Sequence, residues 1–329
     1  MAQLNPYTPD LPLPGQRPEQ ILFVFLDGVG IGPPSAETNP LTTQRHGFFP
    51  LFQLDSTPES IAVQLPPSPH ARALEGHHGV LSASLDMPGL PQSATGQASL
   101  FTGHNGARLL GHHLTAFPER KLTALVREHN LLVRAQRAGK KAAFLNTYTP
   151  RFFELDLPHS VSTICALSLK KPLFMLEEMR AGYSLFHDLT QEGLRAYYGD
   201  EIPLFTPWEG GRWLAGAAAR QEISVYEHFL TDHVGHKAKL PLAVAHLEKL
   251  EDFLAGLLEH LDLERMLMLI CTDHGNFEEA KSKGHTHNRV PLSAWGPGAE
   301  WLTRSCTRLT DVTPALLQLM EVESAPTRT

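Results

Sequence analysis

Three short apolar runs of the sequence each lead into an aspartate. The runs and their aspartates are 21–26 before Asp27, 223–230 before Asp232, and 266–271 before Asp273. Short runs that are apolar throughout and close on turn residues are typical of central parallel strands. Ligands of such sheets bind beyond the carboxyl ends of the strands. We therefore expect the three carboxylates, distant in sequence, to meet at one edge of a sheet.

Histidines accompany two of these aspartates. Asp232 and His236 stand four residues apart in TDHVGH, a spacing that places carboxylate and imidazole on one side of a helix or tight loop. His233, between them, is expected to face away. His274 directly follows Asp273 in CTDHGN, just before a glycine. Two strong ligands in such a loop, with no apolar neighbour to pack, suit a metal site.

A further histidine lies in the glycine-flanked segment GHTHN, where His285 is the candidate ligand and His287 the alternative. Each of these elements alone is compatible with an incidental pair. Several of them at strand ends, made only of Asp and His, are much harder to explain as satisfied core groups. Asp and His together suit Mn²⁺ or Zn²⁺, and the absence of cysteine argues against a structural zinc site.

Ser93 is the candidate nucleophile. It stands in QSATGQ, among small residues and ahead of an expected helix. The free N–H groups and the dipole of a helix N-terminus favour an anion such as phosphate. The alternatives are a simple N-cap serine and Thr95 as the nucleophile in the same turn. No Walker loop, dinucleotide fingerprint or G-x-S-x-G elbow is present, which leaves nucleotide triphosphatases and α/β-hydrolases without support.

Alternating strands and helices indicate an α/β fold with a doubly wound, largely parallel sheet and helices on both faces. A fourth strand is expected at 141–145, and leucines at helical spacing predict an amphipathic helix over 241–263. The expected divisions are a proline-rich N-terminal extension at 1–20, a metal-binding core at 21–149 and 216–329, and a small cap insertion at 150–215.

The composition of the chain limits the classes of partner that it is expected to bind. The chain has 329 residues, a net charge of −7 and no long basic run, so its electrostatics give no support to nucleic-acid binding. No apolar run reaches the roughly 18 residues of a membrane span, and the polar N-terminus does not resemble a secretory signal. Three widely spaced cysteines exclude a disulfide framework. We therefore expect a cytoplasmic protein without a membrane or nucleic-acid partner.

The motifs FLDGVGIG, QSATGQ, TDHVGH, TDHGN and HTHNRVP, in this order, resemble the alkaline phosphatase superfamily. They are most similar to its cofactor-independent phosphoglycerate mutase and phosphopentomutase branch. The resemblance implies two divalent metal ions, Mn²⁺ or Zn²⁺, and a small phosphorylated substrate. It implies one ion on Asp232, His236 and His285. It implies the other ion on Asp27, Ser93, Asp273 and His274, with Ser93 as the residue that becomes phosphorylated.

The sequence also departs from that branch. Thr147 or Tyr148 stands where both mutases have a lysine, and the insertion is short. We therefore expect a phosphatase or phosphodiesterase, with a mutase and a non-catalytic metal- or phosphate-binding module as the alternatives. Candidate groups for holding the phosphoryl oxygens or the substrate are Asn105, Arg108 and Arg151.

Overall fold

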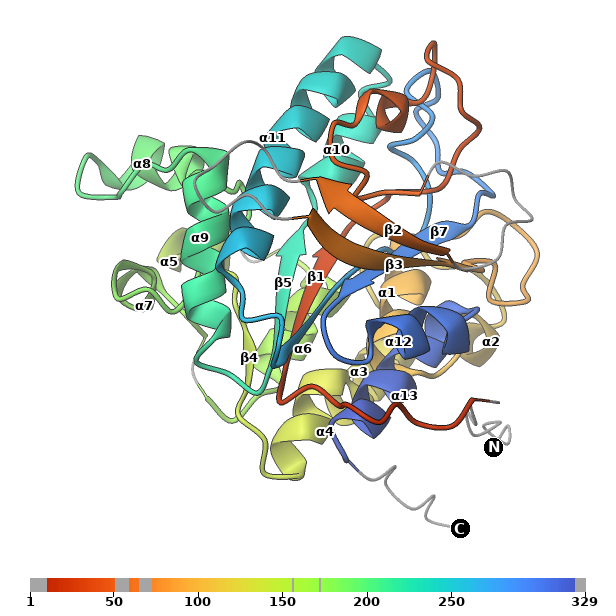
Figure 1. Ribbon diagram of the computed structural model, residues 1–329, viewed down its shortest axis with the longest axis horizontal. Coiled ribbons are helices and arrows are strands. Elements are labelled where there is room, and N and C mark those ends of the chain that lie inside the picture. The colour runs from red at the N-terminus through yellow and green to blue at the C-terminus, as the bar shows by residue number, and fades with distance from the viewer. Residues whose placement is uncertain (1–10, 51–58, 65–72, 156, 172, 323–329) are drawn as a thin grey trace.

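The computed structural model describes residues 11–50, 59–64, 73–155, 157–171 and 173–322 (Figure 1). Their strands form one seven-stranded sheet in the order β2-β3-β7-β6-β1-β5-β4. The parallel strands are β4 (Ala142–Phe144), β5 (Ile223–His228), β1 (Gln20–Leu26) and β6 (Met266–Cys271). The antiparallel strands are β7 (Val290–Trp295), β3 (Ala73–Leu81) and β2 (Glu59–Gln64).

The α/β prediction is confirmed, and the four strands expected from the sequence make up the parallel half. The antiparallel half was not anticipated. β7 reads VPLSAW and β3 reads ALEGHHGVL, so proline, glycine and histidine interrupt the apolar run that marks a buried strand. The sheet is therefore mixed, with the chemistry-bearing residues on its parallel half.

Helices cover both faces of the sheet, because strand side chains alternate between the faces. In β1, Ile21, Phe23 and Phe25 belong to one core cluster, while Leu22 and Val24 belong to the other. The helices whose buried residues join the first cluster are α1 (Ser93–Thr102), α2 (Gly106–Leu110), α3 (Arg120–His129), α4 (Leu131–Arg137), α6 (Val161–Leu167), α12 (Ala299–Ser305) and α13 (Leu309–Leu319). Those of the second are α9 (Pro207–Ala218), α10 (Leu230–Gly235), α11 (Leu240–His260) and the 3₁₀ helix η1 (Pro40–Thr43).

The helix predicted over 241–263 is α11, and it packs side by side with α9 (Figure 1). Two glycines allow the close approach. A Cβ on Gly211 would lie 2.1 Å from the carbonyl oxygen of Phe253, and one on Gly256 would lie 2.1 Å from that of Trp208. Backbone therefore meets backbone across the two helices, which leaves no room for a side chain at either position.

The segment 150–215 contains elements of different character. α6 contributes Val161 and Ile164 to the first core cluster, and α9 packs on the opposite face. The remaining elements are the short helices α5 (Pro150–Glu154), α7 (Leu176–Arg180) and α8 (Glu192–Tyr198). α7 and α8 share a small cluster of their own, built on Met179, Leu194 and Ile202. The division into core and cap stays a prediction.

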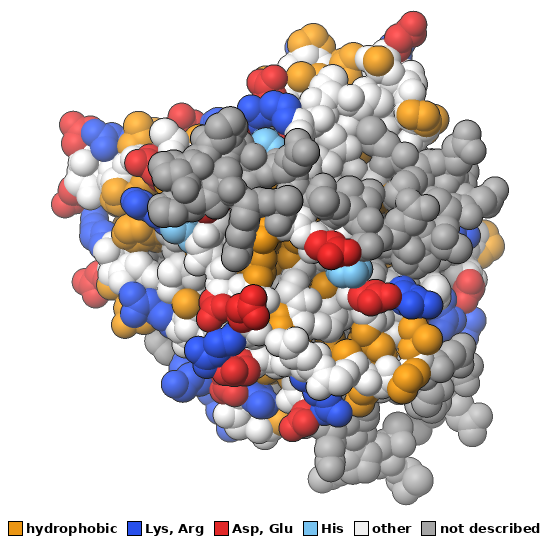
Figure 2. Space-filling view, viewed as in Figure 1, with side chains coloured by type: hydrophobic (Ala, Val, Ile, Leu, Met, Phe, Trp, Pro, Cys, Tyr) orange, Lys and Arg blue, Asp and Glu red, His pale blue; other side chains and the backbone are white. Residues whose placement is uncertain are grey.

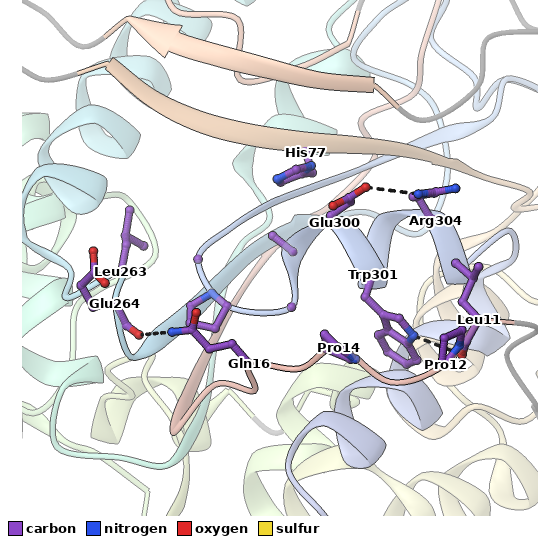
Figure 3. Close-up of a pocket in the computed structure, with 14 residues that line it drawn as sticks. Leu11, Pro12, Pro14, Gln16, His77, Leu263, Glu264, Glu300, Trp301 and Arg304 are labelled. Atoms are coloured by element: carbon purple, nitrogen blue, oxygen red, sulfur yellow. Dashed lines mark hydrogen bonds and ion pairs between the residues drawn. The ribbon is translucent and has the colours of Figure 1, made fainter.

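A hollow of about 510 Å³ lies at the edge of the sheet where β6 begins and β7 ends (Figure 3). The segment 11–16 lines it: Trp301 Nε1 donates to the Leu11 carbonyl (3.4 Å), and Gln16 Nε2 donates to the Glu264 carbonyl (3.2 Å). This is the edge opposite the ends of β1, β5 and β6 that carry the aspartates, so the hollow is separate from them.

The visible surface carries acidic and basic side chains interspersed over the part that Figure 2 colours by type. Within the described part of the chain, none of the helices combines the length and the apolar character that a membrane span requires.

Candidate metal centre

The three aspartates meet at one edge of the sheet, as the sequence predicts. Asp27 follows β1, Asp232 lies in α10 directly beyond the carboxyl end of β5 (Figure 1), and Asp273 follows β6. The backbone secures this meeting, because the Asp27 N–H donates to the His228 carbonyl (3.2 Å) and Thr231 Oγ1 donates to the Asp27 carbonyl (2.6 Å).

One half of the cluster converges on a single ring nitrogen. His274 Nε2 lies 3.0 Å from Ser93 Oγ, 3.3 Å from Asp27 Oδ1 and 3.6 Å from Asp273 Oδ2. Asp273 and His274 are fully buried, and Asp27 is 9% exposed. Two carboxylates, an imidazole and a hydroxyl thus point at one small volume.

The other half gathers Asp232, His236 and His285. His236 Nε2 lies 3.1 Å from Asp232 Oδ2, and His285 Nε2 lies 3.8 Å from Asp232 Oδ1. One ligand atom from each of these three residues lies within 4.8 Å of the others, as do atoms of Asp27, Asp232 and His274. Asp232 belongs to both groups and therefore lies between the two halves.

Both histidines of the second half are oriented by backbone carbonyls. His285 Nδ1 donates to the Pro91 carbonyl (2.9 Å), and His236 Nδ1 donates to the Lys283 carbonyl (2.6 Å). These bonds set the ring tautomer and direct each Nε2 lone pair toward Asp232. A histidine ligand held through its second nitrogen is the usual arrangement around a protein-bound metal.

Electrostatics show that the cluster suits a cation. Burial, and then the neighbouring charge of Asp273, raise the pKa of Asp27 to about 8. Burial alone would lower the pKa of His274, but the charges of Asp273 and Asp27 raise it to about 10. Asp27 Oδ1 and Asp273 Oδ2 are buried and accept no hydrogen bond. A divalent ion would take the place of the His274 proton and supply positive charge to these crowded oxygens, so the residues present fit a metal.

Three kinds of comparison place the chain among known proteins. A family model described as the metalloenzyme superfamily matches residues 219–324. This stretch includes Asp232, His236, Asp273, His274 and His285. The 2,3-bisphosphoglycerate-independent phosphoglycerate mutase of Methylobacillus flagellatus is 29% identical over 105 residues, which is 30% of this chain and 20% of the mutase. That of Agrobacterium fabrum is 34% identical over 115 residues, 33% of this chain and 23% of the mutase.

Solved structures agree on the fold. The alkaline phosphatase from the Antarctic bacterium TAB5 superposes with a TM-score of 0.58 at 11% identity, covering 95% of this chain and all of that one. Thermus thermophilus alkaline phosphatase gives a TM-score of 0.52 at 10% identity, covering 98% of this chain and 95% of that one. The resemblance to the alkaline phosphatase superfamily, on its phosphoglycerate mutase side, is confirmed. The chain spans about a fifth of the length of the mutases it matches.

The match to the metalloenzyme superfamily model supports divalent metal cofactors. Ser93 lies outside the residues that the family model matches. It is the first residue of α1, and Gln92 before it makes no side-chain cap. Thr95, the alternative nucleophile, is fully buried; its hydroxyl donates to the Gln92 carbonyl and accepts from the Leu114 N–H (both 3.3 Å). The Ser93 hydroxyl therefore lies in the cluster, whereas the Thr95 hydroxyl makes hydrogen bonds to the backbone inside the fold.

The other sequence candidates lie in different surroundings. His233 and His287 are exposed and belong to neither group of potential ligand atoms, whereas His285 belongs to one of them. Asn105 caps α2 through the Arg108 N–H (2.8 Å) and donates to the Leu85 carbonyl (2.7 Å). Arg108 is exposed. Arg151 lies over the ring of Tyr197, 4.8 Å from its centroid. The substrate roles of Asn105, Arg108 and Arg151 stay predictions.

Sequence reasoning missed several polar residues around the cluster. Gln97 Nε2 donates to Asp27 Oδ2 (3.2 Å), and Asn276 Nδ2 donates to Asp232 Oδ1 (2.6 Å) and to its carbonyl (3.1 Å). Glu278 is fully buried next to the same loops. For Asn276 and Glu278 the sequence did hold a signal: in TDHGNFEE, polar residues continue three and five positions beyond Asp273.

Proposed function

We propose that this chain is a two-metal phosphoryl-transfer enzyme that forms a phosphoserine at Ser93 from a small phosphate ester. The observation that carries the proposal is the approach of Ser93 Oγ to within 3.0 Å of His274 Nε2, inside a buried Asp/His cluster. A serine used only as a helix cap would have no reason to face two carboxylates and an imidazole.

One ion, Mn²⁺ or Zn²⁺, would be held by Asp232, His236 and His285. The other would be held by Asp27, Ser93, Asp273 and His274. Such ions lower the pKa of a bound oxygen and stabilise the entering and leaving oxygens of an in-line displacement.

The chain's own residues would position the ester. The first N–H groups of α1 have no partner within the helix and are available for phosphoryl oxygens. Ser93 Oγ forms a bond to phosphorus as the bond from phosphorus to the leaving oxygen breaks. The serine proton passes to solvent, and the leaving oxygen takes up a proton. A second acceptor then removes the phosphoryl group from Ser93 by the same displacement, which restores the hydroxyl.

We propose that this acceptor is water or another external molecule, so that the enzyme is a phosphatase or phosphodiesterase. A mutase returns the phosphoryl group to the same substrate and needs cationic groups and a closed cap to retain it. At the place of the mutase lysine, Thr147 Oγ1 bonds to Ser184 Oγ (2.8 Å), and Tyr148 is buried with its hydroxyl donating to Thr163 Oγ1 (3.3 Å). Neither residue supplies a positive charge. In this chain, the segment 150–215 is the one that would form a cap over the site.

A mutase is the second candidate, favoured by the names of the curated relatives. A non-catalytic binding module is disfavoured because the nucleophile position is filled and lies in the cluster. We also propose a cytoplasmic location, supported by three buried and widely spaced cysteines.

A panel of phosphate monoesters and diesters, assayed with added Mn²⁺ or Zn²⁺ and again with chelator, tests the function. Metal-dependent release of phosphate or alcohol from one class supports the proposal. Turnover that is unchanged by chelator, or no turnover of any ester by fully loaded protein, contradicts it.

A further inference from the structure

Among the residues that the structure describes, Glu278 is the one acidic side chain in the loops around the cluster that is fully buried yet has no place among the proposed ligands. We propose that Glu278 is a positioning residue of the metal centre, a single carboxylate that holds the loops carrying Asp27, His274 and His285 in register and, through Asn276, the helix that carries Asp232. The inference rests on the proposed metal centre and adds to it a residue that touches neither metal nor substrate.

Both carboxylate oxygens of Glu278 accept hydrogen bonds. Oε2 accepts from the Gly30 N–H (2.7 Å) and the Asn276 N–H (2.8 Å). Oε1 accepts from Thr286 Oγ1 (2.5 Å) and Asn288 Nδ2 (3.0 Å). All four partners are donors, so an acceptor-only carboxylate satisfies the site and an amide does not.

The four donors come from the segments that carry the ligands. Gly30 lies three residues after Asp27. Thr286 directly follows His285, and the Thr286 N–H also donates to the Gly275 carbonyl (2.9 Å), next to His274. Glu278 therefore connects the end of β1, the loop after β6 and the loop before β7.

The fourth connection runs through Asn276 to α10. Its N–H is fixed by Glu278, and its side-chain amide donates to both Oδ1 and the carbonyl oxygen of Asp232. A Cβ on Gly235 would lie 2.7 Å from Asn276 Oδ1, so the helix carrying Asp232 packs directly on this amide. Displacing Glu278 would thus release the residue that orients Asp232.

The glycines of DGVGIG and DHGN explain why the carboxylate fits. A Cβ on Gly30 would lie 2.2 Å from Glu278 Oε1, one on Gly275 would lie 2.3 Å from the same oxygen, and one on Gly32 would lie 2.9 Å from Glu278 Cγ. Three glycines in two separate loops therefore form a cradle around one side chain. In the sequence they read as turn residues; in the structure they make room for Glu278.

The test compares Glu278→Gln with Glu251→Gln in the full chain. Glu251 is a matched control: it is also fully buried, and its carboxylate accepts from the Arg45 and His46 N–H groups, joining a loop to α11. Each protein is stripped with chelator and titrated with MnCl₂ while bound Mn²⁺ is measured, and thermal unfolding is followed in parallel.

Both variants are expected to unfold at lower temperature than the unaltered protein. Glu278→Gln alone is expected to bind Mn²⁺ about 10- to 100-fold more weakly, the usual cost of losing a residue that orients metal ligands. Equal Mn²⁺ affinity in Glu278→Gln and the unaltered chain would overturn the inference, as would equal weakening in Glu251→Gln.

Two milder variants keep the test decisive if Glu278→Gln fails to fold. Thr286→Val and Asn288→Ala each remove one donor to Oε1, and each is expected to weaken Mn²⁺ binding several-fold; unchanged affinity in both folded variants overturns the inference. The proposed function fails in a different way: the unaltered chain would then bind no Mn²⁺ at the cluster, or would bind it and turn over no phosphate ester.

Discussion

Ser93 Oγ lies 3.0 Å from His274 Nε2, although the two residues are 181 positions apart in the chain. The contact joins the first turn of α1 to the loop after β6. Hydroxyl, imidazole and the carboxylates of Asp27 and Asp273 thereby share one buried volume. This geometry makes the chemical role of Ser93 directly testable.

Ser93→Ala is expected to abolish ester turnover, because no other hydroxyl of its turn faces the cluster. Mass spectrometry of acid-quenched enzyme should find a phosphoryl group on the peptide containing Ser93 in the unaltered protein and none in the variant. Ser84→Ala, an exposed serine of the preceding loop, is the control and should retain the label. Full activity in Ser93→Ala, or label on Thr95 alone, would refute the assignment.

Asp273→Asn is expected to lower the bound metal from two ions per chain and to cost more activity than the about 10- to 100-fold loss typical of an outer-shell change. The reason is that a neutral amide replaces a fully buried carboxylate whose Oδ2 accepts no hydrogen bond within the protein. Elemental analysis after gel filtration measures the loss. Asp252→Asn, which alters a surface ion pair with Arg45, should keep both ions.

Glu227 gives the metal-free protein a pH-dependent stability. Burial raises the pKa of Glu227 to about 8, from an ordinary 4.5, while Ser162 Oγ donates to it (2.8 Å). The folded state favours the protonated form, so wild-type stability falls as pH rises from about 4.5 to about 8. Glu227→Gln should remove the contribution of Glu227 to this slope and gain at most about 5 kcal/mol at pH 8. Urea unfolding of chelator-treated protein at pH 5 and pH 8 measures it; an equal effect at both values contradicts the prediction.

Gly211→Ala should destabilise the fold by about 1–3 kcal/mol, because its new methyl group would meet the Phe253 carbonyl oxygen at 2.1 Å. Gly216→Ala in the same helix is the matched control. Nothing lies within 4 Å of a Cβ there, and alanine is favoured over glycine in a helix by roughly 0.5–1 kcal/mol. Denaturant unfolding should move the two midpoints in opposite directions. A shift in the same direction would show that α9 and α11 do not meet as described.

The sequence predicted the parts of this molecule that have local signals. Apolar runs ending in aspartate predicted β1, β5 and β6. The four-residue spacing of Asp232 and His236 predicted that the two side chains lie together, and they are 3.1 Å apart. The strands β3 and β7 were not predicted, because their pairing is antiparallel and non-local and because their glycines and proline weaken the apolar pattern. Glu278 was not predicted for a related reason: its four donors come from two loops, one after β1 and one between β6 and β7, and no short window of sequence contains them.

Water or an external acceptor is expected to take the phosphoryl group from Ser93. The places where the mutase branch has a lysine hold a Thr147 hydroxyl bonded to Ser184 and a buried Tyr148, so this part of the edge offers no cation to retain a phosphorylated intermediate. Inorganic phosphate and product isomers should be followed together, on phosphoglycerate and on pentose phosphates with Mn²⁺ present. Phosphate release without isomer is the expected result. Stoichiometric isomer without phosphate would instead make the enzyme a mutase, and the charge that retains its intermediate would then have to come from another part of the chain.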